Sequence, residues 1–336
     1  MLRVLALLVT IALSACGSRD ANTWRFAIEE TRGSVQDAYA QQFAKLIEAK
    51  SGGKIKVIVY PYGALGTSDQ TTELLYNGSI QLVMASPGHL GKLIPEVQVF
   101  SLHYVFSGDD AVDNHALADP ELRASFNELY REKNFVLLSM YTEGAMVWTT
   151  NKAIRKPSDF DGVKMRTMTS PILLDDYEAY GASPTPLPYG EVYSALQLNM
   201  IDGQVNPIFA IQEMSFYEVT SYLIFAGQAQ FVTSAMTNAE FYDRLEPEER
   251  GWIDDSIAEL QPYIFGVQQK LNRDRLQKIL ADKPSLHVIH LTDAERAKFR
   301  EASQSVHQGF ASDVGPSGRR ILDQLEAAVS RAAEAK

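Results

Sequence analysis

The residues best suited to bind a small molecule lie between positions 156 and 222. Arg166 ends an apolar segment predicted to be a strand, and a guanidinium there can grip a carboxylate through two parallel N–H bonds. Asn206 follows a turn signal and could offer its amide to the same ligand, and Tyr189 precedes a helix and could supply a ring wall. Open α/β sheets bind ligands in crevices at strand ends. Taken singly, each residue also fits a structural role: a salt-bridged arginine, a turn asparagine and a core tyrosine.

Signals for catalysis are weak. The chain has no G-x-S-x-G elbow, H-E-x-x-H, P-loop or G-x-G-x-x-G motif. Among the six histidines only His287 and His290 are close in sequence, and three positions apart on a predicted strand they face opposite sides. Adjacent carboxylates such as Asp254 and Asp255 fit a solvated helix face. We therefore expect a protein that is not an enzyme, with no catalytic residues, no metal site and no cofactor.

The composition of the chain further limits the classes of protein to which it can belong. The chain has 336 residues, and at about 150 residues per domain this favours two domains. It carries 31 Lys and Arg against 42 Asp and Glu, a net charge of −11, which argues against nucleic acid as a partner. Its single cysteine, Cys16, excludes a disulfide framework.

The N-terminal residues have a pattern typical of an export signal. Residues 1–15 (MLRVLALLVTIALSA) combine Arg3, a short apolar run and small residues. The next residue, Cys16, stands where a lipobox would place the lipid-accepting thiol, and the polar segment 18–23 follows. We expect 1–15 to be a signal peptide, 16–23 a lipid-anchored tether, and the mature protein to act in the periplasm, attached to a membrane through lipidated Cys16. The alternative is an ordinary export signal with a cysteine at the cut site by chance.

Strand and helix patterns alternate after the tether. A strand at 24–28, a helix capped by Ser34, a strand at 54–60, a helix from Ser68 and a strand at 80–84 predict a mostly parallel sheet covered by helices. Pro247 to Lys283 reads as one helix, about 50 Å long at 1.5 Å per residue, with a kink or break expected at Pro262. The remaining strand-like segments are 135–140, 146–150, 163–167, a stretch near 184–188, 229–236 and 286–290, and the remaining helical ones are 122–132, 172–180, 189–198 and 327–335.

Several sequence blocks occur together in a specific order. They are YPYGALG at 60–66, NGSIQ at 77–81, YGEVYSALQ at 189–197 and MIDGQVNP at 200–207. Their order and spacing over residues 24–307 resemble the DctP-type solute-binding proteins of tripartite ATP-independent periplasmic (TRAP) transporters. By position, Arg166 corresponds to the carboxylate-binding arginine of that family, and Asn206 to its asparagine.

The resemblance implies an α/β fold with two lobes, hinge strands and a long brace helix. We expect residues 24–143 plus 232–271 to form lobe I and residues 144–231 plus 272–336 to form lobe II. It also implies that a small organic acid binds between the lobes, and that the closed form docks on membrane permease subunits driven by an ion gradient. Two alternatives remain: an exported lipoprotein enzyme acting on an organic acid, and a subunit that presents its ligand to a sensor kinase.

One position departs from the family pattern. Many members have a second arginine where this chain has Met146, and without that cation a dicarboxylate is less favoured. Glu29 and Glu30 follow the first strand and could hold an ammonium, or could be solvated loop carboxylates. Met146 with Trp148 or Tyr62 could line an apolar subsite, although Met on a strand is usually core. The expected ligands are, in order, a monocarboxylate with an apolar or aromatic body, a zwitterion, and a dicarboxylate.

Overall fold

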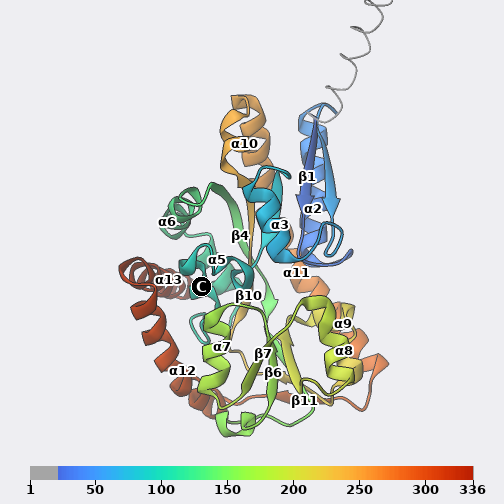
Figure 1. Ribbon diagram of the computed structural model, residues 1–336, viewed down its shortest axis with the longest axis vertical. Coiled ribbons are helices and arrows are strands. Elements are labelled where there is room, and N and C mark those ends of the chain that lie inside the picture. Colours follow the sequence, from blue (N-terminus) through green and yellow to red (C-terminus); the bar gives the residue numbers. More distant parts are fainter. Residues whose placement is uncertain (1–21, 336) are drawn as a thin grey trace, which may run out of the picture.

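A computed structural model describes residues 22–335 and shows two lobes, each built on its own sheet (Figure 1). The expected signal peptide, Cys16 and most of the tether lie outside the described residues, and Thr23 is already the first residue of a strand. Within residues 22–335, no helix has the length and apolar character needed to cross a bilayer.

Lobe I is built on a five-stranded sheet in the order β2-β1-β3-β10-β4. Strands β1, β2 and β3 are parallel, as the alternating pattern predicted, whereas β10 runs antiparallel to both of its neighbours. Ser34 caps helix α2 as expected, its Oγ accepting a bond from the Asp37 N–H at 3.1 Å. The elements of this lobe are β1 (Thr23–Ala27), α2 (Val35–Lys50), β2 (Lys56–Tyr60), α3 (Ser68–Tyr76), β3 (Leu82–Ala85), α4 (Pro87–Leu90), the 3-10 helix η1 (Pro95–Ser101), α5 (Asp110–Leu117), α6 (Pro120–Arg131), β4 (Phe135–Ala145), β10 (Gln230–Asn238) and α10 (Ala239–Arg244).

Lobe II is built on a six-stranded sheet in the order β11-β9-β5-β8-β6-β7. Strand β5 runs antiparallel to β8 and β9, while β6 is parallel to β7 and β8. Its elements are β5 (Val147–Thr150), η2 (Pro157–Phe160), β6 (Lys164–Thr167), α7 (Pro171–Ala179), β7 (Ser183–Pro186), η3 (Tyr189–Glu191), α8 (Val192–Gln197), β8 (Gly203–Asn206), α9 (Ile208–Glu213), η4 (Phe216–Val219), β9 (Tyr222–Phe225) and β11 (His287–His290).

The chain crosses between the lobes along two adjacent strands. Strand β4 continues into β5 through Met146, and β9 returns to β10 through residues 226–229. The Met146 N–H donates to the Ala229 carbonyl at 2.9 Å, so the two crossing segments are bonded to each other. This pair of strands forms the hinge between the sheets.

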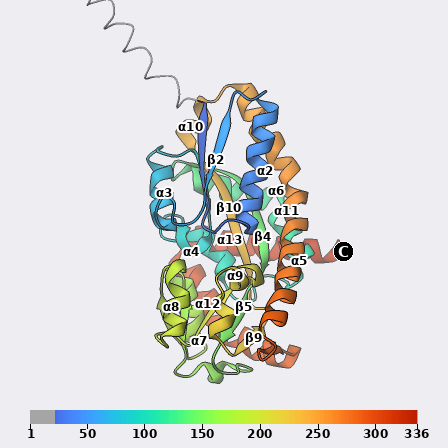
Figure 2. The same cartoon turned by 90° about the vertical axis from the view of Figure 1, so that its right-hand side faces the viewer.

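Helix α11 (Pro247–Asp282) is a third crossing and runs beside both lobes (Figure 2). Its 36 residues form one helix that continues through Pro262, so of the kink or break expected there, the break does not occur. Pro262 and Ala258 are both exposed, and the Ala258 carbonyl that Pro262 leaves without a helical partner lies on the solvent side, where water can satisfy it. Asn272 fixes the helix to the hinge by donating from Nδ2 to the Glu143 carbonyl at 2.8 Å.

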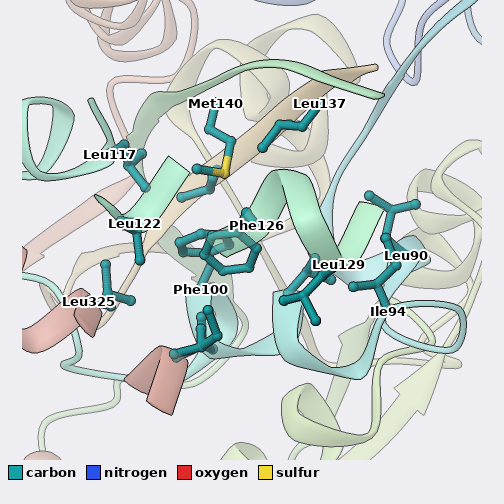
Figure 3. Packing of buried hydrophobic residues seen from close by; sticks show 14 of the residues in the cluster. Leu90, Ile94, Phe100, Leu117, Leu122, Phe126, Leu129, Leu137, Met140 and Leu325 are labelled. Carbon is teal, nitrogen blue, oxygen red and sulfur yellow. The ribbon is translucent and has the colours of Figure 1, made fainter. Parts of the chain in front are cut away.

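The C-terminal helices correct one predicted boundary. Helix α12 (Asp293–Asp313) packs on α7 of lobe II, but α13 (Pro316–Glu334) packs on α5, α6 and η1 of lobe I. Leu325 of α13 lies in the same core as Leu122 and Phe126 (Figure 3), where the Phe126 and Phe100 rings are 4.8 Å apart. The assignment of all of residues 272–336 to lobe II is therefore wrong for α13, because its apolar face completes the lobe I core.

Candidate binding site

A cavity lies between the lobes, and most of the predicted site residues line it. Carboxyl ends of β1 and β3 from lobe I and of β6 and β8 from lobe II border it, as expected for a ligand site at strand ends. We call it the binding cavity. Its lining residues are Glu29, Glu30, Ser68, Ser86, His89, Arg166, Met168, Tyr189, Asn206, Ala210 and Phe231.

Arg166 provides a buried cation in this cavity. Its side chain is 3% exposed, and its Nε and Nη2 donate to the Leu187 carbonyl oxygen at 3.0 and 2.7 Å. No carboxylate within residues 22–335 forms an ion pair with it. Burial lowers the pKa of Arg166 to about 10, so the group stays charged at neutral pH. The structure therefore holds a positive charge at the cavity. The Leu187 carbonyl fixes one edge of the guanidinium, and no carboxylate of residues 22–335 is paired with it.

Two carboxyl groups line the same cavity from lobe I. Glu29 and Glu30 are both buried, so the interpretation of both as solvated loop carboxylates is wrong. Glu29 Oε2 accepts from the Ser86 N–H at 2.9 Å, and its Oε1 is buried with no hydrogen-bond partner. Glu30 Oε2 accepts from the Gln36 N–H at 3.2 Å. Burial raises the pKa of both groups, and the neighbouring Glu143 raises that of Glu30 further.

His89 lies beside Glu29, and sequence reasoning missed it. Its Nδ1 is 3.2 Å from Asp69 Oδ1. Burial opposes a charge on the ring, but the Glu29 and Asp69 carboxylates outweigh it, so the pKa of His89 is raised. The signal that could have found His89 and Ser86 is their place just after β3, at a strand end of the kind that predicted Arg166.

Asn206 and Tyr189 lie where the sequence analysis expected them. Asn206 ends β8 and donates from Nδ2 to Gln204 Oε1. The Tyr189 hydroxyl is buried without a partner, and its ring packs edge-on against Tyr62 of lobe I at 5.7 Å. Tyr189 also packs against lobe II core residues such as Phe216, at 5.9 Å, so it belongs to that core and lines the binding cavity as well.

Met146 and Trp148 lie in different environments in the structure. Met146 lines a second cavity, which adjoins the binding cavity because Met168 and Phe231 line both. Trp148 is fully buried in the lobe II core and donates from Nε1 to the Tyr177 hydroxyl at 2.9 Å. It lines neither cavity, so the apolar subsite predicted for Trp148 is not supported by its position.

Phe231 and Met168 are further lining residues that sequence reasoning missed. Phe231 lies at an irregularity in the pairing of β10 with β4, between Gln230 and Val232, and Met168 follows β6. Neither position carries a recognisable motif. Groups of three or more His, Cys, Asp or Glu side chains arranged to hold a metal ion are absent from residues 22–335.

Comparison with known families agrees with this geometry. The family model described as bacterial extracellular solute-binding protein, family 7 (DctP), matches residues 26–313. The chain is 40% identical over 318 residues to the ectoine/5-hydroxyectoine-binding periplasmic protein UehA of Ruegeria pomeroyi, covering 94% of this chain and 93% of that protein. It is 39% identical over 308 residues to the ectoine-binding periplasmic protein TeaA of Halomonas elongata, covering 91% and 90%.

Solved structures of TRAP solute-binding proteins are also similar to this chain. The ectoine-binding protein of the Halomonas elongata TeaABC TRAP transporter superposes with a TM-score of 0.89 at 38% identity, covering 92% of this chain and 99% of that one. A TRAP periplasmic solute-binding protein of Marinobacter aquaeolei superposes with a TM-score of 0.85 at 42% identity, covering 90% and 99%. The chain therefore belongs to the DctP family of periplasmic solute-binding proteins, the receptors of TRAP transporters.

Proposed function

We propose that this receptor captures a zwitterion, with ectoine as the first candidate, and presents it to a TRAP permease. Ectoine is a small ring that carries one carboxylate and one amidinium cation. Two curated relatives near 40% identity are named for binding it. We therefore rank a zwitterion ahead of the monocarboxylate that the sequence analysis ranked first.

The observation that carries the proposal is the presence, in one cavity, of a buried cation and of a buried carboxyl group with one oxygen that has no hydrogen-bond partner. Arg166 on lobe II has no ion-pair partner among the described residues, and Glu29 on lobe I has a buried oxygen with no hydrogen-bond partner. Leaving a buried charge unpaired is costly. A monocarboxylate would satisfy only Arg166, and a dicarboxylate would place a second anion near Glu29 and Glu30. A zwitterion satisfies both sides.

Each lining residue then has a role. Arg166 and Asn206 hold the carboxylate, and Glu29 and Glu30 hold the cation, which favours their ionised forms. Tyr189, Met168 and Phe231 pack against the ring, and the unpartnered Tyr189 hydroxyl adds a hydrogen bond. Because these groups come from both lobes, binding draws the lobes together. The ligand is carried unchanged, so the protein is a receptor and not an enzyme.

Calorimetry with the purified mature protein tests this assignment. Ectoine is expected to bind, and cyclohexanecarboxylate, a ring acid without the cation, is expected to bind at least tenfold more weakly. Glu29→Gln should weaken ectoine binding and leave cyclohexanecarboxylate binding nearly unchanged. Equal affinity of the wild-type protein for the two ring acids would contradict the proposal.

We also propose that export and lipidation tether the receptor to a membrane. Residues 1–15 are removed and Cys16 becomes the acylated N-terminus, where two or more acyl chains hold the protein stably. Mass spectrometry of the N-terminal peptide from the membrane fraction would identify the modification. The Cys16→Ser variant should lack it and should not be retained with membranes.

A further inference from the structure

The second cavity adjoins the binding cavity and has a polar group of its own. It is bordered by lobe I residues 87, 88, 100, 101, 103 and 230–232, lobe II residues 173 and 205, and hinge residues 146, 228 and 229. Met168 and Phe231 line both spaces, so the two meet at these side chains. We call this space the second chamber.

Gln228 is the unusual side chain in the second chamber. It is 1% exposed, and both its Nε2 and its Oε1 are buried without a hydrogen-bond partner. Its backbone is fixed, because its carbonyl accepts from the Tyr104 N–H at 2.6 Å. Buried side-chain amides are normally hydrogen-bonded, so a donor and an acceptor both left without partners beside a cavity point to a group that enters it.

The other polar groups of the chamber are neutral. Gln230 donates to Asp110 Oδ1 at 2.9 Å and leaves its own Oε1 without a partner. His103 is the only titratable side chain among the described residues that line the chamber. Burial, with His307 nearby, lowers the pKa of His103 to about 3, so it is uncharged at neutral pH. The chamber therefore suits an uncharged group that can both donate and accept hydrogen bonds.

We propose that the second chamber binds an uncharged amide-bearing side chain of the solute through Gln228. An amide supplies one N–H and one carbonyl, which match the two unpartnered atoms of Gln228. The apolar walls formed by Phe100, Met146 and Leu173 accept the methylene groups that lead to it. This inference rests on the zwitterion function proposed above. It adds amino acids with a neutral amide side chain to the compact rings that the receptor would bind.

Two matched amino acids test the proposal by calorimetry. Nγ-acetyl-diaminobutyrate has a side chain that ends in an acetamide, and α-aminoheptanoate has an alkyl side chain of the same length. The wild-type protein should bind the amide about tenfold more tightly than the alkyl compound. Gln228→Leu should bring the two affinities together and leave the affinity for ectoine within about twofold of wild type.

Gln81→Leu is the matched control. Gln81 accepts from the Arg25 N–H at 2.8 Å at the far side of lobe I and lines neither cavity. This variant should keep the tenfold preference for the amide. Thermal melting without ligand checks folding, and Gln228→Leu should melt at or above the wild-type temperature, because it replaces an unsatisfied buried amide.

The outcomes separate this inference from the proposed function. Equal binding of the two amino acids by the wild-type protein, binding of ectoine but of neither amino acid, or a preference that survives Gln228→Leu would overturn the chamber proposal and leave the zwitterion function intact. A Gln228→Leu variant that only lowers the melting temperature, with both affinities unchanged, would show that internal water satisfies this amide, and would also overturn the chamber proposal. Failure of ectoine to bind while the amide preference is present would instead overturn the ectoine assignment.

Discussion

Gly144 and Asn272 meet where the hinge strand β4 contacts helix α11. A Cβ atom added to Gly144 would lie 2.5 Å from Asn272 Nδ2, closer than real contacts allow, and Gly144 has a φ of +122° that other residues rarely adopt. Asn272 donates to the Glu143 carbonyl at 2.8 Å and accepts from the Phe209 N–H at 3.1 Å. One asparagine thus connects the hinge, the long helix and lobe II, and only glycine leaves room for it.

Gly144→Ala should therefore destabilise the protein. Backbone strain and displacement of Asn272 together are expected to cost about 1–3 kcal/mol, measured by urea denaturation. Gly266→Ala is the control in α11, because a Cβ there meets nothing within 4 Å. The control should stabilise the protein by up to about 1 kcal/mol, as expected for alanine in an exposed helix interior. Equal stability of Gly144→Ala and wild type would show that the contact is easily rearranged.

Arg166→Ala should abolish ligand-induced thermal stabilisation while the ligand-free protein stays folded. Removing one partner of a buried charge pair costs about 2–5 kcal/mol, so affinity should fall at least 30-fold. Arg166→Lys keeps the charge but loses the two bonds to the Leu187 carbonyl, and it should recover only part of the affinity. Unchanged affinity of Arg166→Ala in calorimetry would refute the role given to this arginine.

A buried acid pair beside the hinge should make stability depend on pH. Glu143 accepts from Gln36 Nε2 at 3.1 Å and interacts with Glu30. Burial raises the pKa of Glu143 from 4.5 to about 7. Because the folded state holds this proton more tightly than the unfolded state, the resulting stability is present below pH 4.5 and is lost as pH rises through about 7.

The free energy of unfolding should accordingly fall between about pH 5 and pH 8, measured by urea denaturation across that range. Glu143→Gln removes this titration and should reduce the slope. Some slope should remain, because burial also raises the pKa values of Glu29 and Glu213. A slope identical to that of the wild type would place the titrating group elsewhere.

Tyr62 should control how long the lobes stay closed. Its ring packs edge-on against Tyr189 across the cleft, and its hydroxyl accepts from the Gly190 N–H at 3.3 Å. Such an aromatic pair contributes about 0.5–1.5 kcal/mol, so Tyr62→Ala should speed ligand dissociation up to about tenfold in stopped-flow measurements. Tyr62→Phe keeps the ring and should stay within about twofold of wild type. An unchanged dissociation rate in Tyr62→Ala would remove Tyr62 from the closing contact.

Sequence reasoning could bring Arg166 and Asn206 to one cavity because both lie at strand ends; their roles in binding stay predictions. It could not indicate which of Met146 and Trp148 reaches a cavity, because the two residues share a face of the strand. Strand β5 is buried on both faces, so an alternating pattern carries no information about depth. Only the position of Met146 at the hinge brings it to a cavity.

Two other features could not be predicted from the sequence because they depend on tertiary packing. The burial of Glu29 and Glu30 results from loops of both lobes that close over the end of β1, including Ser86 and Tyr189. The packing of α13 on lobe I has no local signal either, since its amphipathic pattern shows that one face is buried but not against which lobe.

Because α13 packs on lobe I, a label on this helix follows the movement of lobe I. Glu334 ends that helix, so a fluorophore attached there stays with lobe I. Leu198, 67% exposed just after α8, belongs to lobe II. Energy transfer between dyes at these two positions would follow the swing of one half against the other, giving an optical sensor for the captured solute without a label in the cleft.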